Sequence, residues 1–167
     1  NKAKYISQAI ESVLNQSFFS FEVIIVDDCS SDGSRDIIDG YASRYPEKIF
    51  PILNKKNLGI SKTRNIALRH CKGEIITYLD GDDIFFPDKL LTEYNLLSSN
   101  NNLSAVYSNF VYISPSGIRL DSFSESNDNP VTGNIFIETF SRQYSISSGN
   151  NYIYEMFYKN SAFEVGL

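Results

Sequence analysis

The fold is decided by one stretch near the start of the chain, Phe21-Glu22-Val23-Ile24-Ile25-Val26-Asp27-Asp28-Cys29-Ser30-Ser31-Asp32. Its first half is a short apolar run rich in β-branched residues, which predicts a buried strand over 21–26. Its second half is a polar turn whose aspartate and serine side chains favour the start of a following helix. A buried strand that ends in a polar turn and leads into a helix is a typical unit of α/β folds.

The same alternation of helix and strand continues on both sides of this stretch. A helix precedes it, because apolar residues recur at helical spacing between Ala3 and Leu14. After it, the pattern predicts helix, strand, helix, strand and helix, with the strands at 49–53 and 74–79. Pro51 has no backbone N–H to donate, so the first of these strands belongs at a sheet edge or a bulge. We therefore expect an α/β fold with a mostly parallel sheet and flanking helices.

Residue types that favour helix ends support these boundaries. Ser61 is the expected N-cap of the helix that follows the strand at 49–53. Gly73 lies just after the expected end of that helix, and Pro87 stands where the next one begins.

The C-terminal part of the chain has a different pattern. Residues 105–113 and the run from Ile118 predict two strands, joined by the turn 115–117. The sequence shows no internal repeat. We interpret 1–117 as the ligand-binding part of one domain and 118–167 as the start of its second part.

The length and composition are those of one globular domain. The chain has 167 residues, of which 42% are hydrophobic and 21% charged, so a disordered or fibrous protein is excluded. It carries 15 Lys and Arg against 20 Asp and Glu, a net charge of −5, which argues against a nucleic-acid-binding protein. The two cysteines form no C-x-x-C pair, and we expect both to be reduced thiols. No apolar run approaches the ~20 residues of a membrane-spanning helix.

Acidic residues follow two of the predicted strands. Asp27 and Asp28 come directly after the strand at 21–26, and the run 80–83 contains three aspartates after the strand at 74–79. Helical crossovers make both strands run in the same direction, so both clusters emerge at the ligand-binding edge of the sheet. Carboxylates brought together repel each other, and Mg²⁺ or Mn²⁺, which prefer oxygen ligands, would relieve the repulsion. Because such an ion completes its shell with phosphate oxygens, we expect a nucleotide or phosphate substrate.

Each candidate residue also has a purely structural interpretation. Asp28, Ser30 and Asp32 could cap the helix that follows them, and Gly59 could serve an ordinary turn rather than a close approach to a ligand. Lys62 and Arg64 are of a type that is commonly solvated, although their helix begins at the ligand-binding edge. The aspartates of 80–83 are harder to explain in this way, since at most one of them can cap the next helix.

Taken in order, these motifs resemble the family 2 glycosyltransferases of the GT-A fold, a Rossmann-like α/β fold. These are inverting enzymes that use nucleotide-sugar donors. The stretches 12–17 and 21–32 look like the opening block of the family. Asn57-Leu58-Gly59-Ile60-Ser61-Lys62-Thr63-Arg64-Asn65 is similar to its N-x-G-x-x-x-A-R-N segment, with Thr63 in place of alanine. Tyr78-Leu79-Asp80-Gly81-Asp82-Asp83 is similar to its D-x-D metal motif.

The resemblance implies roles for individual residues of this chain. Asp28 would hold the nucleotide base, and Arg64 would contact the nucleotide. Asp80 would lie by the ribose or the metal, and Asp82 would bind the Mn²⁺ or Mg²⁺ that bridges the donor diphosphate. The implied substrate-binding residues are Asp27, Asp28, Gly59, Lys62, Arg64 and Asp80, and the implied metal ligands are Asp80 and Asp82.

Two parts of the family pattern are not found in this sequence. The family begins with an additional strand that ends just before the position of Asn1, so we expect the apolar stripe of the first helix to be exposed. Its catalytic base is an acid that follows a segment like 163–167, so we expect the base beyond Leu167 and only donor binding from the residues present. Cys29 stands where the family usually has a glycine.

The residues and the resemblance together predict a glycosyltransferase that moves a sugar from a UDP-sugar to an acceptor hydroxyl with inversion. The resemblance further implies a cytoplasmic enzyme of surface polysaccharide or glycoconjugate synthesis, at the inner face of the membrane if its saccharide acceptor is lipid-linked. Two alternatives remain. A phosphoacceptor receiver domain also holds Mg²⁺ between acids that follow two strands, but it lacks a helix before the first of them. A non-catalytic remnant would bind the nucleotide and transfer nothing.

Overall fold

The computed structural model describes residues 1–99, 103–106, 108, 112–113 and 119–120. The chain divides into two compact units, Asn1–Leu103 and Ser104–Leu167, and the first contains every candidate site residue. In the second unit, β3 (Tyr112–Ile113) pairs antiparallel with β4 (Arg119–Leu120), which confirms the predicted strand pair in part. Its turn at 115–117 and the region from 121 lie outside the described residues. The interpretation of 1–117 and 118–167 as two parts of one domain stays a prediction.

A parallel pair of strands forms the centre of the first unit. β1 (Val23–Asp27) pairs with β2 (Ile49–Leu53), with Val23 opposite Ile49 and Asp27 opposite Leu53. The strand predicted at 21–26 therefore begins two residues later than expected and includes Asp27. Pro51 is exposed, and β2 pairs with β1 alone among the described strands. The predicted edge position of β2 is confirmed.

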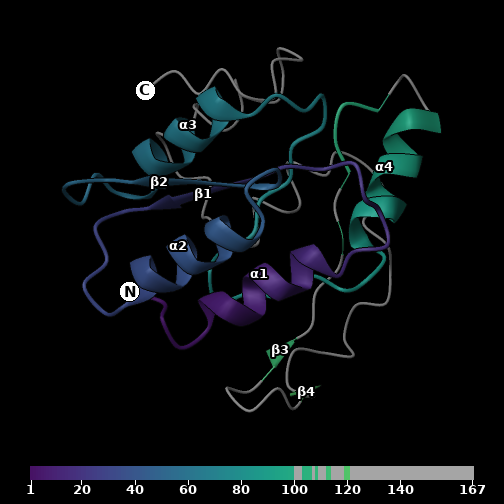
Figure 1. Cartoon of the computed structure of the whole chain (residues 1–167). Helices are drawn as coiled ribbons and strands as arrows, with labels where there is room; N and C mark the ends of the chain where they lie inside the picture. Colours follow the sequence, from purple (N-terminus) through teal and green to yellow (C-terminus); the bar gives the residue numbers. More distant parts are fainter. Residues whose placement is uncertain (100–102, 107, 109–111, 114–118, 121–167) are drawn as a thin grey trace, which may run out of the picture. The chain divides into compact units, whose positions relative to one another are not determined.

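Helices cover both faces of the strand pair (Figure 1). α1 (Ile6–Leu14) and α2 (Ser34–Arg44) lie side by side on one face, and α3 (Ile60–His70) contacts β1 on the other. α4 (Lys89–Ser99) completes the first unit. The prediction of an α/β fold with parallel strands and flanking helices is confirmed.

The main core lies where α1 and α2 meet the sheet. The Tyr41 hydroxyl of α2 donates a hydrogen bond of 2.7 Å to the Glu11 carboxylate of α1 and joins the two helices. Ile10 and Val13 are 4% and 9% exposed, so the expected exposure of the α1 stripe is wrong at these positions. Burying one such side chain contributes about 1.5–3 kcal/mol to stability. The buried residues of this core are Ile6, Ile10, Ile38, Tyr41 and Ile49.

Two local predictions are wrong. No strand forms over 74–79 among the described residues, because a strand exists only where its backbone groups reach those of a partner. This segment is separated from β1 by a cleft. Ser61 is not the N-cap of α3, since the helix begins at Ile60 and Gly59 takes the cap position without a side-chain hydrogen bond.

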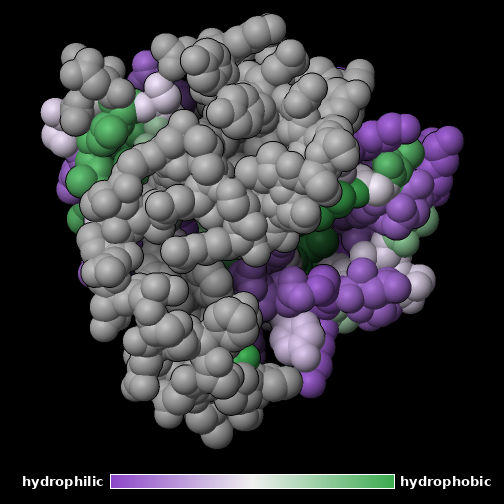
Figure 2. Space-filling model, turned by 180° about the vertical axis from the view of Figure 1, so that it is seen from behind, coloured by the Kyte–Doolittle hydropathy of each residue, from purple (hydrophilic) through white to green (hydrophobic). Residues whose placement is uncertain are grey.

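Figure 2 shows the molecule from behind. The described part of this face is mostly hydrophilic along one side and carries a smaller hydrophobic area on the opposite side. Within the described part of the chain, no helix has the length and apolar character needed to cross a membrane.

Candidate functional site

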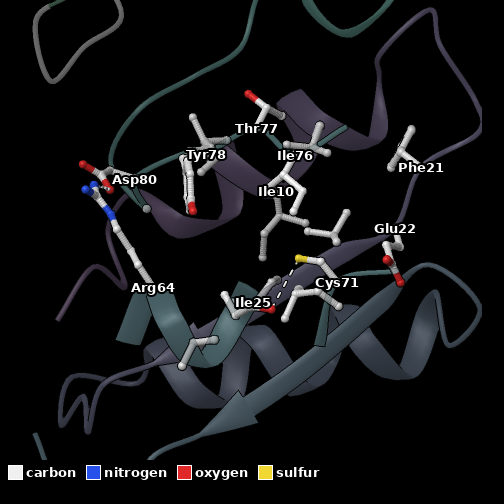
Figure 3. A pocket seen from close by; sticks show the side chains of 18 of the residues that line it. Ile10, Phe21, Glu22, Ile25, Arg64, Cys71, Ile76, Thr77, Tyr78 and Asp80 are labelled. Atoms are coloured by element: carbon white, nitrogen blue, oxygen red, sulfur yellow. Dashed lines mark hydrogen bonds and ion pairs between the residues drawn. The ribbon is translucent and has the colours of Figure 1, made fainter. Parts of the chain in front are cut away.

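A cleft of about 890 Å³ opens between β1 and the segment 73–81. Its middle is apolar, with Ile25 of β1 and Ile76 of the opposite segment among the lining side chains. Arg64 and Asp80 face each other at one end of the cleft, and Glu22 and Cys71 lie toward the other (Figure 3). The charged end is at the carboxyl end of β1, which is where ligands bind in open α/β sheets.

Asp27 ends β1 and is almost fully buried. Its Oδ2 accepts hydrogen bonds of 3.0 Å from the Ser30 backbone N–H and 2.7 Å from Arg35 Nε. Burial raises the pKa of this carboxyl, but the hydrogen bonds from Ser30 and Arg35 outweigh that effect and hold the pKa below 3.8. The Arg35 guanidinium also donates to the Asn54 carbonyl just after β2. Asp27 therefore joins β1, α2 and the end of β2.

Asp28 holds the loop that leads into α3. Its carboxylate accepts hydrogen bonds of 2.8 Å from the backbone N–H groups of Leu58 and Gly59, and one of 3.0 Å from Asn54 Nδ2. Desolvation raises the pKa of Asp28, and these hydrogen bonds lower it further than desolvation raises it. All these contacts lie after β2, so Asp28 does not cap the helix that follows it. The Ser34 backbone N–H at the start of that helix donates instead to Asp32 at 3.1 Å, and Gly33 takes the cap position of α2 without a side-chain cap.

Two unusual backbone conformations shape this end of the cleft. Gly59 has φ +84° and ψ 161°, a combination that is essentially restricted to glycine. It sets the start of α3, and Arg64 lies one turn later on the side that lines the cleft. Cys29 has φ +68°, the left-handed conformation that glycine adopts at least cost. This conformation explains why a glycine suits the position of Cys29.

The acidic turn, which we define as Asp80, Gly81, Asp82 and Asp83, lies at the same end of the cleft. The turn is closed by a hydrogen bond of 3.0 Å from the Asp83 N–H to the Asp80 carbonyl. Gly81 packs so closely on α1 that a Cβ added there would lie 3.2 Å from Ile6 Cδ1. Burial, followed by the negative charges of Asp82 and Asp80, raises the pKa of Asp83.

Two basic side chains reach the acidic turn from different elements. Arg64 of α3 donates to Asp80 Oδ1 at 3.0 Å, and its guanidinium lies 5.7 Å from the centre of the Tyr78 ring. Lys2, from the segment before α1, forms an ion pair with Asp82. The hydrogen bond that Lys2 donates to Asp82 is the main reason that the pKa of Lys2 is raised.

The structure thus brings most of the predicted site residues together. Asp27, Asp28, Arg64 and Asp80 line the charged end of the cleft, and Gly59 contacts Asp28 directly. Lys62 is exposed and does not line the cleft. The role of each residue in binding stays a prediction.

Sequence reasoning missed two basic residues that pair with the aspartates of the site, Arg35 with Asp27 and Lys2 with Asp82. A cation beside Asp27 could have been predicted, because a buried strand that ends in an aspartate needs a positive charge to compensate the buried carboxylate. The contact of Lys2 could not, since Lys2 and Asp82 are 80 positions apart in the sequence.

The acidic turn is compatible with a divalent cation bound together with phosphate. No three His, Cys, Asp or Glu side chains gather into a metal-holding group among the described residues. A nucleotide-type Mg²⁺ site needs only one or two carboxylates, with phosphate oxygens and water completing the shell. Asp80 and Asp82 supply two carboxylates, so this donor set fits such a site.

Comparison with known proteins places the chain among glycosyltransferases. The sequence model described as glycosyl transferase family 2 matches residues 1–157. EpsE of Bacillus subtilis, whose name assigns it provisionally as a glycosyltransferase, is 33% identical over 71% of this chain. TuaG of the same organism, named provisionally as a glycosyltransferase of teichuronic acid biosynthesis, is 34% identical over 74% of the chain. The chain spans less than half the length of these relatives, 43% of EpsE and 48% of TuaG.

A solved structure shares both fold and sequence with part of this chain. The Staphylococcus aureus TarS fragment 1–349, crystallised in complex with UDP, is 29% identical over 60% of this chain with a TM-score of 0.55, and 30% of TarS 1–349 is covered. The fold is therefore the GT-A fold, as the sequence resemblance implied.

Proposed function

Because the chain belongs to glycosyl transferase family 2, we propose that it transfers a sugar from a nucleotide-diphosphate donor to an acceptor hydroxyl with inversion. We take the donor to be a UDP-sugar, since the similar TarS structure was solved with UDP. The observation that carries the proposal is the meeting of Asp28, Arg64 and Asp80 at one end of a single cleft. A nucleotide placed there would have its base near Asp28 and its diphosphate near the acidic turn.

Asp28 suits recognition of the base. A carboxylate offers about four acceptor positions, and the backbone of Leu58 and Gly59 and the side chain of Asn54 already occupy most of them. These bonds fix the carboxylate in place, so that a remaining position can take an N–H group of the base. Arg64 supplies positive charge beside the expected place of the diphosphate.

Asp82, assisted by Asp80, would hold Mn²⁺ or Mg²⁺, which when bound takes up negative charge on the departing diphosphate. In the reaction, the acceptor oxygen forms a bond to the anomeric carbon while the bond from that carbon to the diphosphate breaks. A general base takes the acceptor proton and UDP leaves. We assign no residue of the described cleft to the general base.

The acceptor is proposed to be a saccharide or a lipid-linked saccharide of a surface polysaccharide or glycoconjugate. The name of TuaG, which refers to teichuronic acid biosynthesis, supports this class of product. We propose a cytoplasmic location, at the inner face of the membrane if the acceptor is lipid-linked.

The metal assignment is tested by isothermal titration calorimetry, in which UDP is titrated into the protein with and without Mn²⁺. We expect Asp82→Asn to abolish the Mn²⁺-dependent part of binding, because a neutral amide is a poorer ligand for a hard cation. Asp39→Asn is the matched control, since Asp39 is an exposed residue of α2 that does not line the cleft. Equal Mn²⁺ dependence in the wild type and in Asp82→Asn would contradict the assignment.

The alternatives differ in outcome from a transferase. In a receiver domain, phosphoramidate would phosphorylate a single aspartate, and Asp28→Ala would weaken binding of the metal alone. In the proposed transferase, Asp28→Ala weakens UDP binding and leaves binding of the bare metal nearly intact. A nucleotide-binding remnant would bind UDP but would not hydrolyse a UDP-sugar, so donor hydrolysis is measured beside UDP binding. The match to glycosyl transferase family 2 and the presence of α1 before β1 favour the transferase.

A further inference from the structure

We propose that Lys2 is an exchangeable counter-ion of the acidic turn, whose ammonium group occupies the place beside Asp82 until a divalent cation displaces it. The inference rests on the metal assignment of the proposed function. It adds a residue that lowers the affinity for the metal alone and keeps the acidic turn paired while no cation is bound.

The backbone of Lys2 is fixed on both sides. Its carbonyl accepts hydrogen bonds of 2.8 Å from the Tyr5 N–H and 2.9 Å from the Ile6 N–H, just before and at the start of α1. Its own N–H donates to Ser34 Oγ at 2.9 Å, at the start of α2. Because the side chain leaves from this fixed base and passes close to Gly81, its ammonium group is delivered to the acidic turn.

The two cations of the acidic turn are held to different degrees. Arg64 contacts Asp80 and also lies over the Tyr78 ring, so two neighbours fix its guanidinium. Lys2 contacts Asp82 at its tip. Both ion pairs are exposed and weak, with side chains 46% and 56% exposed for Arg64 and Asp80 and 47% and 40% exposed for Lys2 and Asp82. Because the Tyr78 ring also holds Arg64, Lys2 is the cation that gives way.

A divalent cation and the Lys2 ammonium group would compete for the Asp82 carboxylate. A bound Mn²⁺ would place two positive charges within a few ångströms of the ammonium nitrogen, and like charges at such distances repel. The metal also gains direct carboxylate ligation, which an ammonium group cannot match. Metal binding therefore breaks the ion pair. The free energy of metal binding is less favourable by the free energy that the ion pair contributes.

The test is isothermal titration calorimetry of Mn²⁺ alone, without nucleotide. The proteins compared are the wild type, Lys2→Met and Lys4→Met. Lys4→Met removes the same charge two positions away, where the Lys4 ammonium lies 5.2 Å from the centre of the Tyr5 ring. We expect Lys2→Met to bind Mn²⁺ about two- to fivefold more tightly than the wild type, the range given by exposed ion pairs. Lys4→Met should bind as the wild type does.

A third variant, Lys2→Arg, keeps the positive charge and should return the affinity for Mn²⁺ to near the wild-type value. Thermal melting curves verify that all variants fold. Equal affinities of Lys2→Met and Lys4→Met would overturn the proposal, as would weaker binding by Lys2→Met, which would make Lys2 a helper of the bound metal. If neither the wild type nor Lys2→Met binds Mn²⁺, even with UDP present, the metal assignment itself fails. The two failures are thus distinguishable.

Discussion

The two groups of aspartates at the charged end of the cleft are held in opposite ways. Asp27 and Asp28 are bound by backbone N–H groups, by the Asn54 amide and by a short-range ion pair to Arg35. In the acidic turn, Asp80 and Asp82 are paired with charged side chains that arrive from distant parts of the chain, Arg64 and Lys2. The first group is therefore fixed by the framework of the fold, whereas the ion pairs of the second can exchange partners.

This difference indicates where a ligand can gain binding energy. A buried carboxylate that is held by fixed donors, such as Asp27, has little access to a new partner. An exposed carboxylate paired with a flexible lysine loses little when a stronger cation arrives. Asp27 thus stabilises the fold, whereas the same residue type in the acidic turn is available for a cation.

The largest expected effect comes from breaking the framework cluster. Asp27→Asn should lower the free energy of unfolding by about 2 kcal/mol, because Arg35 loses a charged acceptor and the buried carboxylate is replaced by an amide. Urea denaturation of both proteins at pH 7 measures the difference. A loss below about 0.5 kcal/mol would show that Asp27 is not a framework residue.

The pH dependence of the same pair of proteins sharpens this prediction. The pKa of Asp27 is lowered in the folded protein from its ordinary value of 3.8, so its contribution is fully present above that value and is lost as the pH falls through the folded pKa. The stability gap between the wild type and Asp27→Asn should therefore be constant from about pH 7 to 5 and should shrink by about pH 3. A gap that widens on acidification would contradict this sign.

A smaller effect is expected from the loop that Asp28 holds. Gly59→Ala should destabilise the protein by about 1–2 kcal/mol, because alanine is strained at φ +84° and ψ 161°. Gly40→Ala is the matched control, since Gly40 lies in α2 and an added Cβ meets nothing within 4 Å. The control should be stabilising by about 0.5–1 kcal/mol. Thermal melting of both variants shows whether each substitution lowers or raises the melting temperature. Equal shifts in melting temperature would mean that the Gly59 conformation is not required.

The smallest stability effect is expected in the acidic turn. Asp82→Asn makes the same chemical change as Asp27→Asn, but we expect it to alter the free energy of unfolding by less than about 1 kcal/mol, because the pair with Lys2 is exposed. The measurement is the same urea denaturation. A loss as large as that of Asp27→Asn would place the acidic turn in the framework and remove the contrast between the clusters.

The sequence predicted those parts of the fold whose signal is local. α1, β1 and α2 follow from helical spacing and from one apolar run that ends in a polar turn. The strand predicted at 74–79 was wrong because a strand depends on a partner at hydrogen-bonding distance, and the apolar pattern carries no information on that distance. Ser61 was wrong because the special backbone of Gly59 starts α3 one residue earlier.

The candidate site was predictable to a similar extent. The rule that ligands lie at the carboxyl ends of parallel strands brought Asp28 and Asp80 to one edge, and both line the charged end of the cleft. The hydrogen bonds of Asp28 to the loop before α3 and the ion pair of Lys2 with Asp82 span long stretches of sequence. Such contacts depend on tertiary packing, which no local pattern specifies.

Cys29, whose backbone is in the left-handed conformation, offers a position for attaching a fluorescent dye. Its thiol is exposed and adjoins Asp28 in the chain, whereas the Cys71 thiol is half-buried, and burial followed by the charge of Glu22 raises the pKa of Cys71. These are the two cysteines of the sequence. A maleimide fluorophore at near-neutral pH will therefore attach first at Cys29, because alkylation needs an accessible thiolate. The native sequence thus carries a dye position beside the expected nucleotide base, where changes in emission report ligand arrival in real time.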